Sequence, residues 1–255
     1  MSLRIDISWL IATLLLGIRI TAATMLVPVL GPTRVPVPAR VLIVMGLSAF
    51  MVAALGVPQR ISLDLVSLIL AAGIEVLIGA AFAFGFMAAY AATQFAGRAL
   101  DIQIGFGAAG AINPATQTFS PLFGSLLGML GVLVFLSMDG HLLLIRALGA
   151  SVTTFPPGAT QLSLDVPALL RHSGVMFSFG LALAGPIMLM LLLADVALAV
   201  AARSMPQLNV FVLSFTVKIV LGLIGIAAAV KFATAIFTAL FMQSIGYWRE
   251  LAGAA

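Results

Sequence analysis

Apolar residues fall in six long runs that shorter polar segments separate. Each run is close to, or longer than, the ~20 consecutive apolar residues with which a helix crosses a bilayer. The pattern therefore predicts an all-α polytopic membrane protein, folded as one domain over residues 1–255. The runs cover residues 7–30, 41–57, 65–93, 121–148, 172–202 and 209–242.

Two of the runs depart from the pattern of a straight spanning helix. Pro186 lies inside the fifth run and should kink it, because proline lacks the N–H that a helix needs. The sixth run has 34 residues, about 50 Å of helix against a hydrocarbon core of ~30 Å. It must break, tilt strongly or leave the bilayer, and we expect a break at Lys231 or at the Gly222 and Gly225 pair.

The segments between the runs also carry information. Three prolines in residues 31–38 predict an extended connector before the second run. Residues 94–120 mix ions, glycines and apolar residues, which predicts a long non-spanning stretch, and residues 149–171 form a second polar loop. Irregular backbone survives at membrane depth only when protein buries it or when it lines water. Residues 105–120 are therefore either a flexible apolar loop that closes a pore or a loop on the aqueous side.

Two ions occupy matched positions around the turn between the last two runs. Asp195 lies 11 residues before Pro206, and Lys218 lies 11 residues after Gln207. If the two arms fold back as a helical hairpin, the charges reach similar depth and can face each other. An ion within a lipid-embedded helix normally pairs, contacts other protein or lines water.

The ions within or beside apolar runs allow two interpretations. One is a proton or ion pathway, as in a small ion-coupled secondary transporter with Glu75, Asp195 and Lys218 as its relay. The other, which we favour, is ion pairing between helices or subunits of a protein assembly. The ions concerned are Arg19, Glu75, Asp101, Asp139, Asp195, Lys218 and Lys231.

Composition supports the membrane assignment and narrows the chemistry. The chain is 63% hydrophobic and 8% charged, with a mean hydropathy of +1.25. It has no cysteine and two histidines, without a metal-ligand spacing, a nucleophile motif or a nucleotide-binding loop. We therefore expect neither an enzyme nor a bound cofactor. The net charge of +4 comes from scattered residues, which argues against a nucleic-acid partner.

Charge does not decide the orientation of the chain. If six runs cross in turn, five arginines fall on one side and four on the other, so the positive-inside rule gives no answer. This balance indicates that some apolar helices do not cross as simple spans.

Asp6 and Arg19 disfavour a cleaved signal peptide, so we expect residues 7–30 to be an uncleaved first membrane segment. The chain's 24 glycines fit either packing within the chain or a subunit interface.

Four short motifs resemble the FliR family of flagellar type III export-gate proteins and its injectisome counterpart, the T subunit. The most extended one is PQLNVF at residues 206–211, with Asp195 and Arg203 before it and Lys218 after it. The others are EVLIG at residues 75–79, GRALD with QIGF at residues 97–106, and GHL at residues 140–142. They occur in the family's order, and the overall length agrees.

The resemblance implies a subunit of a conical helical hetero-oligomer with kinked helices and helical hairpins. In the family, the P and Q subunits (FliP and FliQ) complete the channel for unfolded flagellar proteins, and the B subunit (FlhB) lies nearby. It implies a location in the bacterial inner membrane at the flagellar basal body, contact with membrane lipid, and helices that the assembly lifts out of the bilayer. Residues 105–120 correspond to the family's pore plug, with Gly105, Phe106, Gly107, Gly110, Asn113, Pro114 and Phe119 as its residues.

The resemblance also implies that a set of polar residues makes structural contacts within the subunit or with its neighbours. The set comprises Glu75, Asp101, Gln103, Asp195, Arg203, Pro206, Gln207, Asn209 and Lys218. Three positions depart from the family pattern: Thr216 stands where proline is frequent, Asp139 where asparagine is, and Asn113 where aspartate is. The departures weaken the expectation of a kink at Thr216 and of a particular charge at the other two positions.

Overall fold

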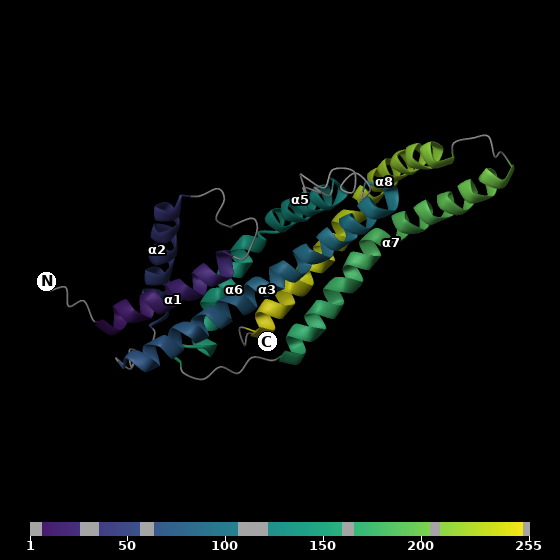
Figure 1. Cartoon of the computed structure of the whole chain (residues 1–255). Coiled ribbons are helices and arrows are strands. Elements are labelled where there is room, and N and C mark those ends of the chain that lie inside the picture. Colours follow the sequence, from purple (N-terminus) through teal and green to yellow (C-terminus); the bar gives the residue numbers. More distant parts are fainter. Residues whose placement is uncertain are drawn as a thin grey trace. The chain divides into compact units, whose positions relative to one another are not determined.

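The computed structural model describes residues 7–25, 36–56, 64–106, 122–159, 166–204 and 210–251, and these ranges contain helices and no strand. The predicted all-α class is therefore confirmed. Figure 1 shows the helices in chain order. They are α1 (Ile7–Met25), α2 (Val37–Leu55), α3 (Leu65–Ile104), α5 (Leu122–Ser137), α6 (Gly140–Thr154), α7 (Val166–Ser204) and α8 (Val210–Leu251).

The helices are long and apolar enough for a polytopic membrane protein. Among the described residues, α1, α2, α3 and α7 are each long and apolar enough to cross a membrane. The same holds for two pairs of helical segments taken together: α5 with α6, and the two halves of α8. The count is therefore four spans, or up to six if each bent pair is one span.

The chain divides into two compact units. Unit 1 comprises Met1–Met87, Asp139–His172 and Gln243–Ala255, and unit 2 comprises Ala88–Met138 and Ser173–Met242. Helices α3, α7 and α8 contribute residues to both units. One domain over residues 1–255 stays a prediction.

In unit 1, the apolar core forms where α1 packs against α2 (Figure 1). Leu16 and Ile20 of α1 and Val52 of α2 are almost completely buried, and Val152 of α6 joins them. On α1 the core residues Ala12, Leu16 and Ile20 lie four positions apart, which places them on one face. The outward residues of α2 are also apolar and largely exposed, and they include Val41, Leu42, Ile43 and Phe50.

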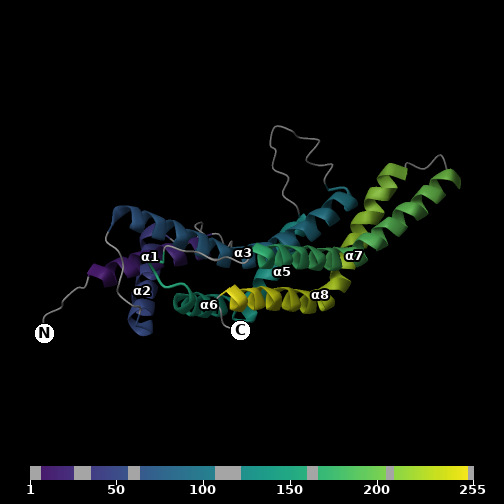
Figure 2. The same ribbon diagram turned by 90° about the horizontal axis from the view of Figure 1, so that it is seen from below.

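In unit 2, α7 and α8 run side by side in opposite directions in both views (Figures 1 and 2). Gly225 of α8 lies so close to α7 that a Cβ there would press on Met190 and Ile187. The rings of Phe135 on α5 and Phe241 on α8 pack with centroids 5.2 Å apart. The helical hairpin predicted from the spacing around Pro206 and Gln207 is therefore present, although the turn itself lies outside the described residues.

Several predicted boundaries are wrong. Helix α3 continues to Ile104, so residues 94–104 are not part of a non-spanning stretch. Gln94, Asp101 and Gln103 of this stretch find hydrogen-bond partners inside unit 2. The predicted fourth run is two helices, α5 and α6, with a break at Met138 and Asp139. Asp139 between them has a φ of +54°, a left-handed conformation that ends a right-handed helix.

The polar loop predicted over residues 149–171 is also too long. Helix α6 extends to Thr154, and α7 begins at Val166 rather than at His172. Pro167 does not prevent the earlier start, since proline is accommodated in the first turn of a helix. The proline-rich connector ends earlier than predicted: Pro36 is extended, but Pro38 lies in the first turn of α2.

The overlong sixth run does bend. Helix α8 extends to Leu251, and its halves Val212–Ala228 and Phe232–Leu251 meet at 64°. The bend lies between Ala228 and Phe232, after the Gly222 and Gly225 pair, and a break at Lys231 itself stays a prediction. Those two glycines are instead places where other side chains approach α8. Pro186 lies inside α7, and a kink there stays a prediction.

Two glycines of α3 are contact points within unit 1. A Cβ on Gly79 would overlap the carbonyl oxygen of Arg19 in α1, and a Cβ on Gly85 would overlap the Trp248 ring. Gly73, six residues before Gly79, has no atom within 4 Å of the position that its Cβ would take. Of the two interpretations of the glycines, packing within the chain therefore applies to Gly79 and Gly85.

This contrast gives a matched pair of variants. Gly79→Ala should lower the free energy of unfolding by about 1–3 kcal/mol, because the added methyl group forces two backbones apart. Gly73→Ala should leave it unchanged or raise it by up to about 1 kcal/mol, since alanine favours a helix over glycine. Unfolding in detergent micelles with increasing SDS, followed by tryptophan fluorescence, measures both. Equal effects at the two positions would contradict the close approach of α1 and α3.

Candidate functional site

Among the described residues, polar contacts join helices within each of the two units. In unit 1, the guanidinium of Arg19 on α1 binds both carboxylate oxygens of Glu75 on α3. Its Nε donates to Oε2 at 2.6 Å, and its Nη2 donates to Oε1 at 3.1 Å. Both side chains are almost inaccessible, at 0% and 1% exposure. This bidentate arrangement is the strong form of a charge-assisted hydrogen bond.

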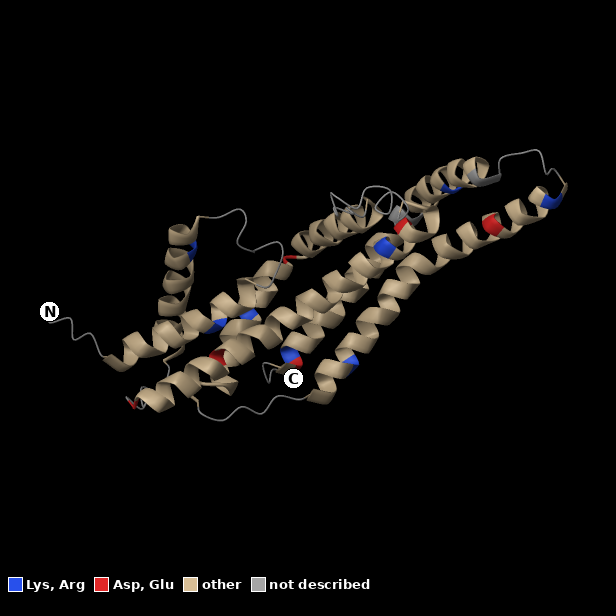
Figure 3. Cartoon of the chain, viewed as in Figure 1, with Lys and Arg blue, Asp and Glu red and all other residues tan. Residues whose placement is uncertain are grey.

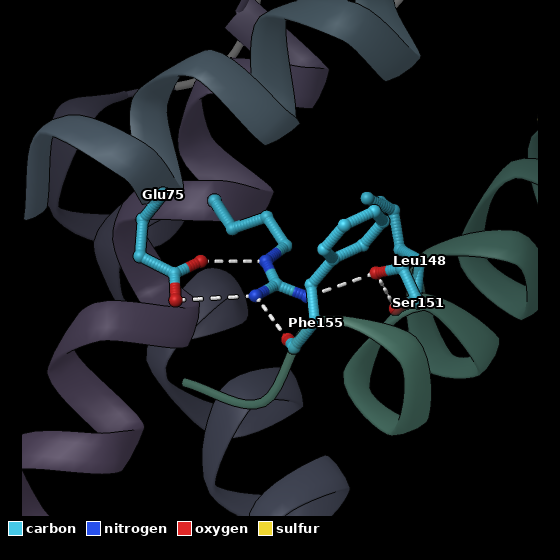
Figure 4. A network of polar contacts seen from close by, with 5 residues as sticks. Glu75, Leu148, Ser151 and Phe155 are labelled. Atoms are coloured by element: carbon cyan, nitrogen blue, oxygen red, sulfur yellow. Dashed lines mark hydrogen bonds and ion pairs between the residues drawn. The ribbon is translucent and has the colours of Figure 1, made fainter. Parts of the chain in front are cut away.

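The remaining donors of Arg19 reach the end of α6, as Figure 4 shows. Its Nη1 donates to the hydroxyl of Ser151 at 2.9 Å, and its Nη2 donates to the carbonyl oxygen of Phe155 at 2.7 Å. Ser151 in turn donates to the carbonyl oxygen of Leu148. One buried cation therefore ties together α1, α3 and the C-terminal end of α6.

The sequence identified both ions of this pair but not that they contact each other. Both Arg19 and Glu75 stood out as ions within apolar runs, but they are 56 residues apart. No turn between two neighbouring helices relates their depths, as one does for Asp195 and Lys218. Their pairing therefore could not be read from spacing.

A second polar cluster in unit 1 fixes the end of α8 to the middle of α3. Tyr247 donates to the carbonyl oxygen of Ala81 at 3.1 Å, and Trp248 donates to that of Phe82 at 2.8 Å. Ser244 donates to the carbonyl oxygen of Gly85 at 3.0 Å. The His172 ring stacks on Tyr247 with centroids 4.6 Å apart, and its Nε2 lies 3.2 Å from the carbonyl oxygen of Gly85.

In unit 2, Asp195 and Lys218 form the ion pair that their matched depths predict. The Nζ of Lys218 lies 2.6 Å from Oδ1 of Asp195, which links α8 to α7. The pair is only partly covered, with Asp195 36% and Lys218 18% exposed. Glu75, the third member of the alternative relay, is bound by Arg19 in unit 1.

Gln103 extends this contact to α3. Lys218 also donates to the main-chain oxygen of Gln103 at 3.3 Å, and the Gln103 side chain donates to the carbonyl oxygen of Met188 at 2.8 Å. The side-chain oxygen of Gln103 is buried and has no partner among the described residues. Three helices, α3, α7 and α8, therefore meet at Lys218.

Asp101 holds the start of α5. Its carboxylate is fully buried and accepts hydrogen bonds from the backbone N–H groups of Phe123 and Gly124, at 3.1 and 3.2 Å. These N–H groups belong to the first turn of α5, where they have no partner within the helix and where negative charge is favoured. Gly97, one turn earlier on α3, lies directly against Gly124. The role of Asp101 is thus a capping role that acts from another helix.

Two of the residues assigned to the plug by resemblance lie at the end of α3. Gly105 has a φ of +104°, which favours glycine. The ring of Phe106 packs near Phe123 and Phe215, with centroids 5.9 and 6.2 Å apart. The other assigned plug residues, Gly107, Gly110, Asn113, Pro114 and Phe119, lie outside the described residues.

The last assigned residues flank the turn between α7 and α8. Arg203 is exposed in the final turn of α7 and has no partner among the described residues. Pro206, Gln207 and Asn209 lie outside the described part of the chain. Their contacts therefore stay predictions.

The fold and these contacts define the class of protein: a polytopic all-α membrane protein whose buried ions join its helices. The family model described as "Bacterial export proteins, family 1" matches residues 10–244. The chain therefore belongs to this family of bacterial export proteins. It is a non-enzymatic subunit of a type III export apparatus.

Individual relatives agree with the family assignment. The chain is 29% identical to a flagellar biosynthetic protein FliR of Bacillus subtilis over 246 residues, 94% of each chain. It is 34% identical to the FliR of Escherichia coli over 155 residues, 60% of this chain and 59% of that one. It is also 28% identical to the surface presentation of antigens protein SpaR of Salmonella typhimurium, over 63% of this chain and 60% of SpaR.

Proposed function

We propose that this chain is a subunit of the flagellar type III export gate and forms the export channel together with P and Q subunits. The observation that carries the proposal is the family match over residues 10–244. The flagellar assignment rests on the similarity to a flagellar protein along 94% of both chains. The gate would lie in the inner membrane at the flagellar basal body, with a B subunit (FlhB) nearby and unfolded flagellar proteins as cargo.

The lengths of the helices support an assembly. Helices α3, α7 and α8 have 40, 39 and 42 residues, about 60 Å each at 1.5 Å per residue. A hydrocarbon core of ~30 Å covers only half of such a helix. Large apolar residues are nevertheless exposed along all three helices, and an exposed apolar surface outside the bilayer needs protein to cover it. Partner subunits would provide that cover.

Co-purification tests the proposal. The tagged chain, isolated from its native membrane in mild detergent, should carry several copies of other small helical membrane proteins for each copy of itself. Native mass spectrometry of the complex measures the stoichiometry. A stable monomer or homodimer that exchanges a solute in liposomes would instead establish a secondary transporter and overturn the gate.

The proposed pore plug gives a separate prediction. Deletion of residues 107–110 should make the assembled gate leaky to small ions while the subunits still co-purify, because a shortened loop no longer fills the channel. Conductance of the purified complex in planar bilayers measures the leak. A complex that assembles and stays closed would show that this loop is not the plug.

A further inference from the structure

One face of the second half of α3 is left uncovered by the described residues. Between residues 88 and 104, four residues are exposed, namely Ala91, Phe95, Arg98 and Ile102, and the others are buried or half-buried. Their spacing of four, three and four positions is the 3.5-residue repeat along which two helices pack side by side. We refer to these four residues as the Arg98 face.

Within unit 2, α7 borders this face without covering it. The Phe95 ring lies 5.0 Å from the Phe177 ring of α7, and Phe177 is itself 55% exposed. Gly180 brings the α7 backbone directly against the carbonyl oxygen of Ala92. The two helices therefore pack closely and leave an apolar surface on both sides of that contact, with Ile102 68% exposed on the α3 side.

Arg98 is the one charge on this face. It has no hydrogen bond or ion pair with any residue that the structure describes, and Figure 3 shows how sparsely charges are spaced along these helices. Asp101, one turn away, is fully buried and bonds to the start of α5. A guanidinium in apolar surroundings is costly unless an anion pairs with it. Whatever covers the Arg98 face must therefore bring a negative charge.

We propose that the Arg98 face docks an apolar helix of another subunit of the export apparatus, which carries one aspartate or glutamate opposite Arg98. A carboxylate suits the planar fork of arginine, which binds it through two parallel hydrogen bonds. A helix of the partner fits this face because its side chains can pack along the same repeat. A phospholipid would offer a phosphate to Arg98 and acyl chains to Ala91, Phe95 and Ile102, so its capture alone is an outcome that contradicts the inference. The inference rests on the proposed function, because the partner comes from the same assembly.

The first test identifies what lies on the face. A photo-crosslinking amino acid at Ile102, and in a second strain at Leu42 of α2, is activated in whole cells that express the tagged chain. Both positions are exposed and apolar, but only Ile102 belongs to the Arg98 face. We expect Ile102 to crosslink to an apolar helix of a different subunit, with an acidic residue within one turn of the crosslinked site. Adducts with phospholipid alone, or with a second copy of this chain, would overturn the inference.

The second test asks whether the charge matters. Arg98→Glu should reduce the Ile102 crosslink and the co-purified partner about tenfold or more, since two carboxylates would then face each other. Arg98→Lys should retain most of both, and the Leu42 crosslinking pattern should not change. Replacing the partner's acidic residue by arginine should restore the complex of Arg98→Glu.

The controls separate this inference from the proposed function. Arg171→Glu changes an exposed arginine whose ion pair with Glu250 is also exposed, and it should leave co-purification within about twofold. If Arg98→Glu has no more effect than Arg171→Glu, the docking inference fails while the gate assignment stands. If the native chain brings down no other subunit at all, the proposed function itself fails.

Discussion

Replacing Glu75 by glutamine should lower the free energy of unfolding by about 3–5 kcal/mol, although the side chain keeps its shape. The change leaves the guanidinium of Arg19 charged at a site with 0% exposure. A buried ion that loses its partner keeps the cost of leaving water and no longer gains the attraction that offset it. SDS unfolding in detergent micelles, followed by tryptophan fluorescence, measures the loss.

Two further variants test the cause of that loss. Arg171→Gln breaks an ion pair that is 65% and 58% exposed, and it should cost less than about 1 kcal/mol. Arg19→Met combined with Glu75→Leu removes both buried charges and should destabilise less than Glu75→Gln alone. If Glu75→Gln lowers the free energy of unfolding no more than Arg171→Gln does, the Arg19–Glu75 pair does not stabilise unit 1.

The sequence predicted the apolar helices well, because burial in lipid or protein makes whole runs apolar. It predicted their ends poorly. Gln94 and Asp101 resembled loop residues, yet both lie within α3. Asp101 is buried since it binds the first turn of α5, a partner more than 20 residues away. A polar residue marks a loop only when nothing inside the fold can bind it.

The two ion pairs show what spacing can and cannot predict. Asp195 and Lys218 sit on the two arms of one hairpin, so equal distances from the turn place them at equal depth. Arg19 and Glu75 come from helices separated by α2, and only the three-dimensional packing shows that they meet. The Asp139-Gly140 pair is a turn signal and marks the break between α5 and α6. Because the residues on both sides are apolar, the hydropathy pattern placed the pair inside one continuous run.

The two ion pairs differ in burial. Arg19 and Glu75 are enclosed within unit 1 itself. Asp195 and Lys218 are partly exposed, and Leu192, Leu193 and Val196 beside Asp195 are more than half exposed. If partner subunits cover these apolar residues, they also take the ion pair out of water. We therefore expect the first pair to determine the stability of the chain and the second to determine its assembly.

Asp195→Lys should block assembly of the gate while it changes the stability of the isolated chain only slightly. In the free chain, water screens the repulsion between the new ammonium and Lys218. In the assembly, covered apolar residues would enclose two like charges that lack a counter-ion. The amount of partner subunits that co-purify with the tagged chain measures assembly, and thermal unfolding in detergent measures stability.

Adding Lys218→Asp to Asp195→Lys should restore assembly only in part. The exchange re-creates an ion pair between α7 and α8, but Lys218 also donates to the main-chain oxygen of Gln103. A carboxylate at position 218 would face that oxygen without a proton to share. Asp195→Asn, which removes the charge without reversing it, should lie between the native chain and Asp195→Lys. If the exchange restores nothing, each ion finds its decisive partner on another subunit, and the contact between α7 and α8 does not direct assembly.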